Sequence, residues 1–235
     1  MKKSSSELKG MAKGLLAGHY GLLIGAVLVI SFASIIVSGI LTAVFPQNNT
    51  LSQILYTVCT FIVGLLSAVL SVGLSKMVIN ISRGQDTRLS DLLHGFTHQP
   101  DRIILTYLLI SLLGGACMLP GGLFLVLGLL TKSVLLSVLA ILAFLAGTVF
   151  AVILELSYSQ VFYLYLDAPE KGVLQLMRES RALMKGNKGR YFYLQLSFIG
   201  LVLLSVLTCF IGMLWLVPYM EMTTILFYRN LTGEV

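Results

Sequence analysis

The sequence predicts an all-α membrane protein, on the evidence of its composition and the order of its apolar segments. Of 235 residues, 57% are hydrophobic and only 11% are charged, against about 25% charged residues in soluble domains. Several apolar segments are long enough for a helix to cross the roughly 30 Å of bilayer hydrocarbon. Short polar segments with Lys and Arg separate them. We therefore expect one polytopic helix bundle over residues 1–235, with short amphipathic helices beside the spans.

The chain begins with a short amphipathic helix and a first span. Ser4 and Glu7 fit a capping box that opens the helix. The apolar residues that follow recur every three or four positions and form one helical face, namely Leu8, Met11, Ala12, Leu15 and Leu16. Gly18 is expected to end the helix in the left-handed conformation. The next apolar segment, 20–45, is too long for a signal-peptide core and is expected to remain as a span.

The second part contains an apolar segment over 51–81, where we expect Gly73 to mark a bend, and then a polar loop. Within that loop Leu89–Phe96 has the apolar spacing of a short surface helix, which we expect to end at Gly95. His94 and His98 are four residues apart, but the helix is expected to stop between them. With no third ligand nearby, no metal site is predicted.

Two further apolar segments follow, over 103–130 and 133–166. Pro120-Gly121-Gly122 interrupts the first of them, and such a break within a membrane needs neighbouring groups to satisfy the freed backbone. Residues 119–132 are therefore expected to form a kink, a loop or a re-entrant element.

The last part opens with a basic amphipathic helix over Val173–Lys185, followed by an apolar segment over 191–227. As one rod that segment would be roughly 55 Å long, well beyond the bilayer core. It must therefore fold back, and 208–212 is the expected turn.

The distribution of cations predicts six spans with both termini in the cytoplasm. Lys and Arg gather in alternate polar segments, which are 2–13, 76–102 and 171–190. The intervening turns near 46–50, 131–133 and 208–212 carry only Lys132. Because cytoplasmic loops of membrane proteins are enriched in Lys and Arg, the basic segments are expected on the cytoplasmic side of the cell membrane.

The three amphipathic helices end alike, with Leu15–Gly18, Leu92–Gly95 and Leu183–Gly186, and a hairpin follows each. This pattern suggests three divergent repeats of surface helix plus two spans. Their expected bounds are 5–81, 87–166 and 170–230. The alternative is that any helix meeting a membrane has such an end.

Most of the chain resembles a known family, including Leu8-Lys9, Ala12-Lys13 and Pro120-Gly121, and the C-terminal third carries the most specific matches. The matching residues are Leu196-Ser-Phe-Ile-Gly200, Leu214-Trp215, Pro218-Tyr219, Phe227-Tyr228 and, earlier, Glu179-Ser180 with Leu183-Met-Lys-Gly186. They resemble the bacterial integral membrane proteins grouped as domain of unknown function 975. This chain departs from the pattern between Gly122 and Glu155, where it is longer, and at His19 and Leu201. The resemblance implies a multi-span protein of a bacterial cytoplasmic membrane, with no established activity and no catalytic residues.

Four polar residues within or beside the spans form a candidate site, because ionisable groups in a membrane are costly and usually functional. They are Lys76, Glu155, Gln160 and Glu221. We expect them to converge, with Lys76 pairing with Glu221 or Glu155. The alternative is that each is solvated at the level of the lipid headgroups.

The third amphipathic helix carries a second candidate site, for anionic lipid headgroups. Its cations are Lys171, Arg178, Arg181 and Lys185, each worth roughly 1 kcal/mol near an anionic surface. The alternative is that these residues only set the topology, with Glu179 as a local partner.

Enzyme chemistry is not expected, since the sequence has no serine elbow, no HExxH and no phosphate-binding glycine loop. Cys59, Cys117 and Cys209 lie in separate apolar segments, and no cofactor is expected. The cations are confined to short segments between spans, which argues against nucleic acid. The leading hypothesis is a membrane interaction or accessory protein that engages lipid or an unidentified protein partner. The alternative is a small-molecule or ion transporter.

Overall fold

The structure, a computed structural model, describes residues 2–46 and 48–235. Within these ranges the regular elements are all helices, which confirms the predicted all-α fold. The chain divides into two compact units, residues 1–104 with 190–235 and residues 105–189. Each unit is described by itself.

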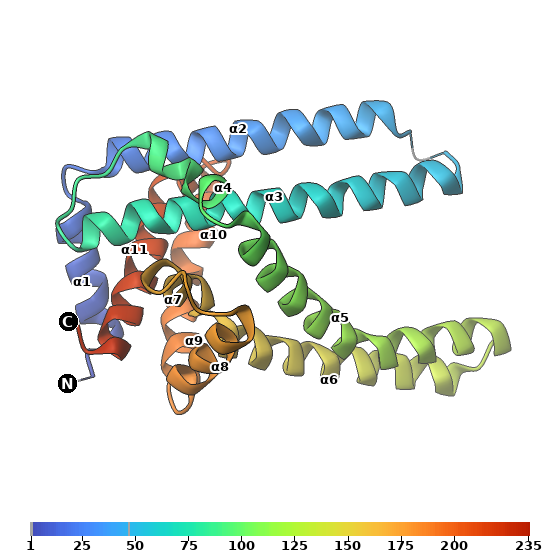
Figure 1. Ribbon diagram of the computed structural model, residues 1–235. Helices are drawn as coiled ribbons and strands as arrows, with labels where there is room; N and C mark the ends of the chain where they lie inside the picture. The colour runs from blue at the N-terminus through green and yellow to red at the C-terminus, as the bar shows by residue number, and fades with distance from the viewer. Residues whose placement is uncertain (1, 47) are drawn as a thin grey trace. The chain divides into compact units, whose positions relative to one another are not determined.

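The first unit contains most of the helices. They are α1 (Ser5–Leu16), α2 (Tyr20–Val44), α3 (Thr50–Ser82), the 3₁₀ helix η1 (Leu89–Leu93), α4 (His94–Thr97), α9 (Lys188–Leu196), α10 (Ile199–Leu207) and α11 (Met213–Thr232). Helices α2 and α3 lie side by side as an antiparallel pair (Figure 1), and α11 packs against both.

Helix α1 is built as its sequence predicts. The Ser4 hydroxyl accepts the Glu7 backbone N–H and the Glu7 carboxylate accepts the Ser4 N–H, which completes the capping box. Gly18 has φ +87°, the left-handed conformation expected after the helix. The apolar face of α1 is buried and packs mainly on α11. The helix is thereby anchored to the first unit.

The predicted roles of Gly73 and Gly95 are wrong, because both glycines serve close packing. Helix α3 continues through Gly73, where a Cβ atom would lie 1.9 Å from the Leu92 carbonyl oxygen. At Gly95, which lies within α4, a Cβ atom would lie 2.6 Å from the Val69 carbonyl oxygen. The absence of both side chains lets η1 and α4 rest directly on α3.

The second unit consists of most of α5 (Pro100–Thr131), α6 (Val134–Tyr158), α7 (Val161–Asp167) and α8 (Val173–Met184). Helix α5 continues through Pro120 to Thr131, so residues 119–131 are helical and form no loop. Figure 1 shows α5 changing direction along its length, as expected where proline removes a helical hydrogen bond. The turn to α6 comes at Lys132, which has φ +50°.

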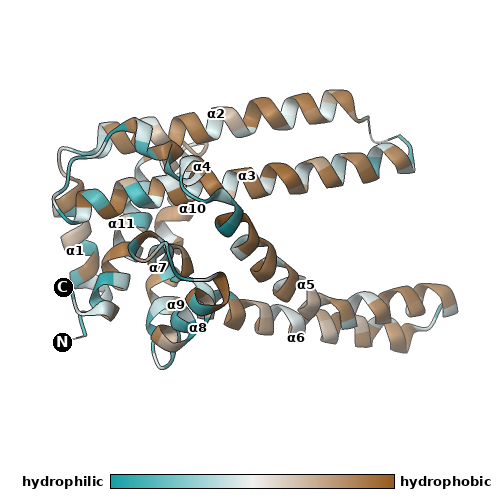
Figure 2. Cartoon of the chain, viewed as in Figure 1, coloured by the Kyte–Doolittle hydropathy of each residue, from teal (hydrophilic) through white to brown (hydrophobic). Residues whose placement is uncertain are grey.

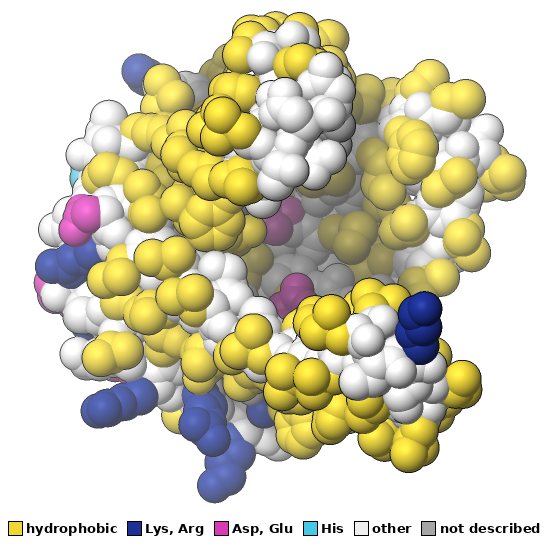
Figure 3. All heavy atoms as spheres, turned by 90° about the vertical axis from the view of Figure 1, so that its right-hand side faces the viewer, with side chains coloured by type: hydrophobic (Ala, Val, Ile, Leu, Met, Phe, Trp, Pro, Cys, Tyr) yellow, Lys and Arg dark blue, Asp and Glu magenta, His cyan; other side chains and the backbone are white. Residues whose placement is uncertain are grey.

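The described residues include five helical segments long and apolar enough to cross a membrane. They are Tyr20–Val44, Thr50–Ser82, Pro100–Thr131, Val134–Asp167 and Lys188–Leu207. Figure 2 shows hydrophobic residues along the long helices, and Figure 3 shows apolar side chains over most of the helix surface facing the viewer. Helix α11 has the length of a span but contains Glu221 and Arg229, and the number of passes stays a prediction.

The last apolar segment folds back where expected. Helix α10 ends at Leu207 and α11 begins at Met213, with Cys209 and Phe210 at positive φ between them. The three repeats also follow the observed order of short and long helices, but they stay a prediction. The two compact units do not follow the bounds of these repeats, because the first unit contains residues from both ends of the chain.

The close contact at Gly73 predicts a specific sensitivity to a methyl group. Gly73→Ala is expected to lower the melting temperature of the detergent-purified protein by about 5 °C, since overpacking costs about 1–3 kcal/mol. Gly64→Ala is the matched control, because it lies in the same helix with no atom within 4 Å of the added methyl group. Equal melting temperatures for the two variants would contradict the close contact of α3 with η1.

Candidate functional site

The carboxylate of Glu221 is the polar centre of the contact between α3 and α11. It accepts a 2.6 Å hydrogen bond from the Ser75 hydroxyl of α3. Lys76 follows Ser75 and points about 100° further round the helix. Among the described residues Lys76 forms no ion pair, so the predicted pairing with Glu221 is replaced by a neutral hydroxyl donor.

Lys76 instead lies near His94 at the start of α4. Burial, together with the neighbouring His98 and Lys76, lowers the pKa of His94 and favours its neutral form at pH 7. The His94 and His98 rings stack with their centroids 4.1 Å apart. Within the described ranges no three potential metal ligands come together.

Glu155 and Gln160, the other two predicted residues of the polar site, belong to the second unit. Glu155 is exposed on α6, whereas Gln160 is fully buried at the junction of α6 and α7. Because Lys76 and Glu221 belong to the first unit, the convergence of all four residues stays a prediction.

The junction between α6 and α7 is closed by Ser180 of α8. At this break the Gln160 N–H and the Ser157 carbonyl lose the helical partners they would have in one continuous helix. The Ser180 hydroxyl accepts a hydrogen bond from the first at 3.3 Å and donates to the second at 2.9 Å. One buried side chain thereby satisfies both groups and fixes α8 to the break.

Helix α8 presents a basic flank to the surface. Its buried residues recur at helical spacing and pack on α6 and α7; they are Val173, Leu176, Met177, Ser180 and Met184. Arg178, Arg181 and Lys185 lie together on one flank and are exposed. The side chain of Leu174, which is 63% exposed, lies on the same flank. The helix predicted over Val173–Lys185 is thus present as α8, with three of its cations exposed.

Lys171 differs from the other predicted lipid contacts. Its ammonium group forms a 2.8 Å ion pair with Glu179, which also accepts a hydrogen bond from Gln175. These hydrogen bonds lower the pKa of Glu179 and keep the carboxylate ionised. Glu179 therefore neutralises Lys171 rather than Arg178 or Arg181.

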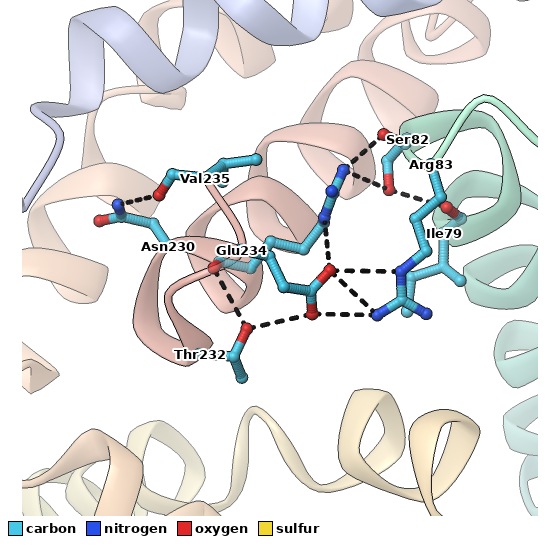
Figure 4. A network of polar contacts seen from close by, with 8 residues as sticks. Ile79, Ser82, Arg83, Asn230, Thr232, Glu234 and Val235 are labelled. Carbon is cyan, nitrogen blue, oxygen red and sulfur yellow. Dashed lines mark hydrogen bonds and ion pairs between the residues drawn. The ribbon is translucent and has the colours of Figure 1, made fainter.

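A polar network that the sequence analysis missed joins the end of α3 to the C-terminal segment (Figure 4). The Glu234 carboxylate accepts hydrogen bonds from Arg83 and Arg229 at 3.0 Å and from Thr232 at 3.2 Å. Arg229 also donates to the Ser82 carbonyl. Burial alone would raise the pKa of Glu234, but the two guanidinium groups outweigh it and lower the pKa. Arg83, which the sequence analysis assigned only to topology, and Arg229 thus share a structural partner.

A second set of polar contacts brings the two ends of the first unit together. Arg190 donates to the Lys3 carbonyl at 2.7 Å and to the Asn230 side-chain oxygen at 3.4 Å. The Lys3 N–H donates to the same oxygen at 3.2 Å. For the Glu234 network, the sequence did contain a signal. Glu234 is a carboxylate five residues after Arg229, in an otherwise uncharged tail.

Comparison with known proteins places the chain in a family. The model described as "Protein of unknown function (DUF975)" matches residues 1–234. The chain belongs to this family. The match confirms the resemblance that the sequence showed over most of the chain. No curated protein and no solved structure matches the chain.

The Glu234 network predicts a pH-dependent contribution to stability. Because the folded pKa lies below the ordinary 4.5, the contribution is present above that pH and is lost as pH falls through the lowered pKa. Glu234→Gln is expected to lower the melting temperature at pH 7 by about 2–4 °C at most, since partly exposed ion pairs contribute about 1 kcal/mol or less.

The control is Glu170→Gln, which changes an exposed carboxylate. The difference between wild type and Glu234→Gln should shrink as the pH is lowered from 7 to 3 in thermal-unfolding measurements. A difference that does not change with pH would contradict an ionised Glu234.

Proposed function

We propose that this DUF975 protein is a non-enzymatic membrane interaction or accessory protein that engages anionic lipid headgroups through the basic flank of α8. The observation that carries the proposal is that Arg178, Arg181 and Lys185 are exposed together while Glu179 is held by Lys171. Among the described residues these three cations have no ion-pair partner. Anionic lipid supplies the missing charge.

The side chains on the basic flank of α8 suit contact with a phospholipid headgroup better than contact with water only. Each guanidinium group can donate two parallel hydrogen bonds to a phosphate. Exposed Leu174 lies beside the cations and can enter the apolar edge of the bilayer, as in helices that lie in the interface. The opposite flank, with Gln175 and Glu179, forms local hydrogen bonds instead.

The proposed setting is the cytoplasmic membrane of a bacterium, with both chain ends and α8 on the cytoplasmic side. Support comes from the concentration of Lys and Arg in alternate polar segments, since such segments remain in the cytoplasm. The inner leaflet would then present its anionic lipids to α8. Recruitment of a protein partner to this face is compatible with the same role.

A second candidate function, a small-molecule or ion transporter, is favoured by Glu221. Its carboxylate lies between two apolar helices and holds a short hydrogen bond from Ser75. Carboxylates in such positions often mark ion pathways. This hypothesis is distinguished from lipid engagement by which added molecule stabilises the protein.

The test compares the stabilisation of the detergent-purified protein by phosphatidylglycerol and by phosphatidylcholine. The wild type is expected to gain more from phosphatidylglycerol, and the triple variant Arg178→Ala/Arg181→Ala/Lys185→Ala to lose at least half of that difference. The estimate follows from roughly 1 kcal/mol per cation at an anionic surface.

The control is the triple variant Arg178→Lys/Arg181→Lys/Lys185→Arg, which preserves the charge. It is expected to keep most of the preference for phosphatidylglycerol. An unchanged preference in the triple alanine variant would contradict the proposal. Stabilisation by one class of solute, lost in Glu221→Gln, would favour the transporter.

A further inference from the structure

The first unit contains a groove that the sequence analysis did not anticipate. It lies between the start of α2, helix α10 and the first half of α11, and has a volume of about 250 Å³. Its lining residues are Tyr20, Leu201, Leu204, Ser205, Thr208, Gly212, Trp215, Leu216 and Tyr219. The volume of the groove is smaller than the ~300–1,000 Å³ typical of pockets for drug-sized molecules. The dimensions therefore favour a narrow occupant.

The walls of the groove favour a hydrocarbon chain. The side chains of Leu201, Leu204 and Trp215 are 41%, 55% and 51% exposed, so the groove opens onto an apolar surface. The hydroxyls of Ser205 and Thr208 donate to backbone carbonyls within their own segment. These two hydroxyls have already used their hydrogens, so this part of the lining offers no free hydroxyl donor to a polar ligand.

One end of the groove is polar and positively charged. Tyr219 lies seven residues after Gly212, about 10 Å along a helix, and Tyr20 lines the groove with it. The ammonium group of Lys13 lies 5.8 Å from the centre of the Tyr219 ring. The groove thus runs from an apolar turn to a pair of phenols beside a cation.

A second cation reaches the same aromatic cluster. The Phe198 and Tyr219 rings meet edge to face at 5.3 Å, and the Lys9 ammonium group lies 3.9 Å from the centre of the Phe198 ring. Lys9 also donates to the Ser197 carbonyl. Burial and the charge of Lys13 lower the pKa of Lys9, as expected for two neighbouring cations. No carboxylate among the described residues forms an ion pair with either lysine.

We propose that this groove binds one anionic phospholipid, with an acyl chain along α10 and α11 and the phosphate beside Lys9, Lys13 and the phenols of Tyr20 and Tyr219. A phosphate placed there offsets the repulsion between the two lysines and can accept hydrogen bonds from the phenols. The occupant is amphipathic because the groove is apolar along its length and cationic at one end. The inference rests on the proposed lipid engagement but uses different helices and residues.

The single tryptophan of the chain, Trp215, lines the groove and reports its occupancy. The full-length protein is placed in phosphatidylcholine nanodiscs, and phosphatidylglycerol with brominated acyl chains is titrated while the fluorescence of Trp215 is measured. Bromine quenches tryptophan on contact. Half-maximal quenching is expected at a mole fraction about tenfold lower than with brominated phosphatidylcholine, because two cations favour the anionic headgroup.

Lys9→Gln/Lys13→Gln is expected to abolish this preference, whereas the charge-matched control Lys2→Gln/Lys132→Gln, at two exposed lysines, should keep it. Leu204→Phe narrows the groove and is expected to weaken quenching by both lipids. Its control is Leu203→Phe, which changes an exposed leucine of α10 outside the lining.

The Arg178→Ala/Arg181→Ala/Lys185→Ala variant separates the two lipid sites. Retention of the Trp215 preference in this variant, with loss in Lys9→Gln/Lys13→Gln, supports the groove site. Equal quenching by both lipids in the wild type would overturn it, as would a preference unaffected by Lys9→Gln/Lys13→Gln. The lipid-dependent stabilisation described above for the α8 triple alanine variant tests the proposed function separately from the groove. Complete loss of the preference on adding soluble glycerol phosphate would show a headgroup site without an acyl chain, which also contradicts the inference.

Discussion

In hydrocarbon a backbone N–H or C=O group has no water to bond, so each break in a spanning helix needs a partner from within the protein. The protein meets this constraint with side chains. Ser180 closes the break between α6 and α7, and the Thr208 hydroxyl accepts the Gly212 N–H in the turn before α11. The amphipathic helix α8 is thus positioned by a backbone requirement, and its basic flank follows from that position.

The same requirement explains which parts of the fold could be read from the sequence. The helices of α1 and α8, the turn at 208–212 and the left-handed Gly18 depend on local spacing and turn chemistry, and all were predicted. Gly73 and Gly95 were misinterpreted, because their role depends on a carbonyl oxygen from another segment that lies where a Cβ atom would be. Pro120 was ambiguous for the same reason, since only the neighbouring helix decides whether a proline break becomes a loop.

The candidate sites show a similar division. Exposure of Arg178, Arg181 and Lys185 follows from the helical period of α8, and the sequence was sufficient. The partners of Glu221 and Lys9 lie far away in the chain, as does Arg83, one of the partners of Glu234, so no spacing rule could find them. The sequence analysis predicted the ammonium group of Lys76 as a partner for Glu221 because opposite charges attract. In the structure the hydroxyl of Ser75, the residue before Lys76, donates a hydrogen bond to this carboxylate.

The cations of the chain therefore serve different purposes. Arg83 and Arg229 hold Glu234, and Lys171 holds Glu179, which fixes the polar ends of helices. The exposed cations of α8, and Lys9 and Lys13 beside an apolar groove, have no carboxylate of their own among the described residues. Anionic lipid is the counter-charge that we propose for both places.

The central claim is tested most directly by native mass spectrometry of the wild-type protein released from nanodiscs with equal amounts of phosphatidylglycerol and phosphatidylcholine. The lipids that remain bound should be enriched in phosphatidylglycerol. Bound lipids in the same one-to-one ratio as the bilayer would contradict a protein that selects anionic headgroups.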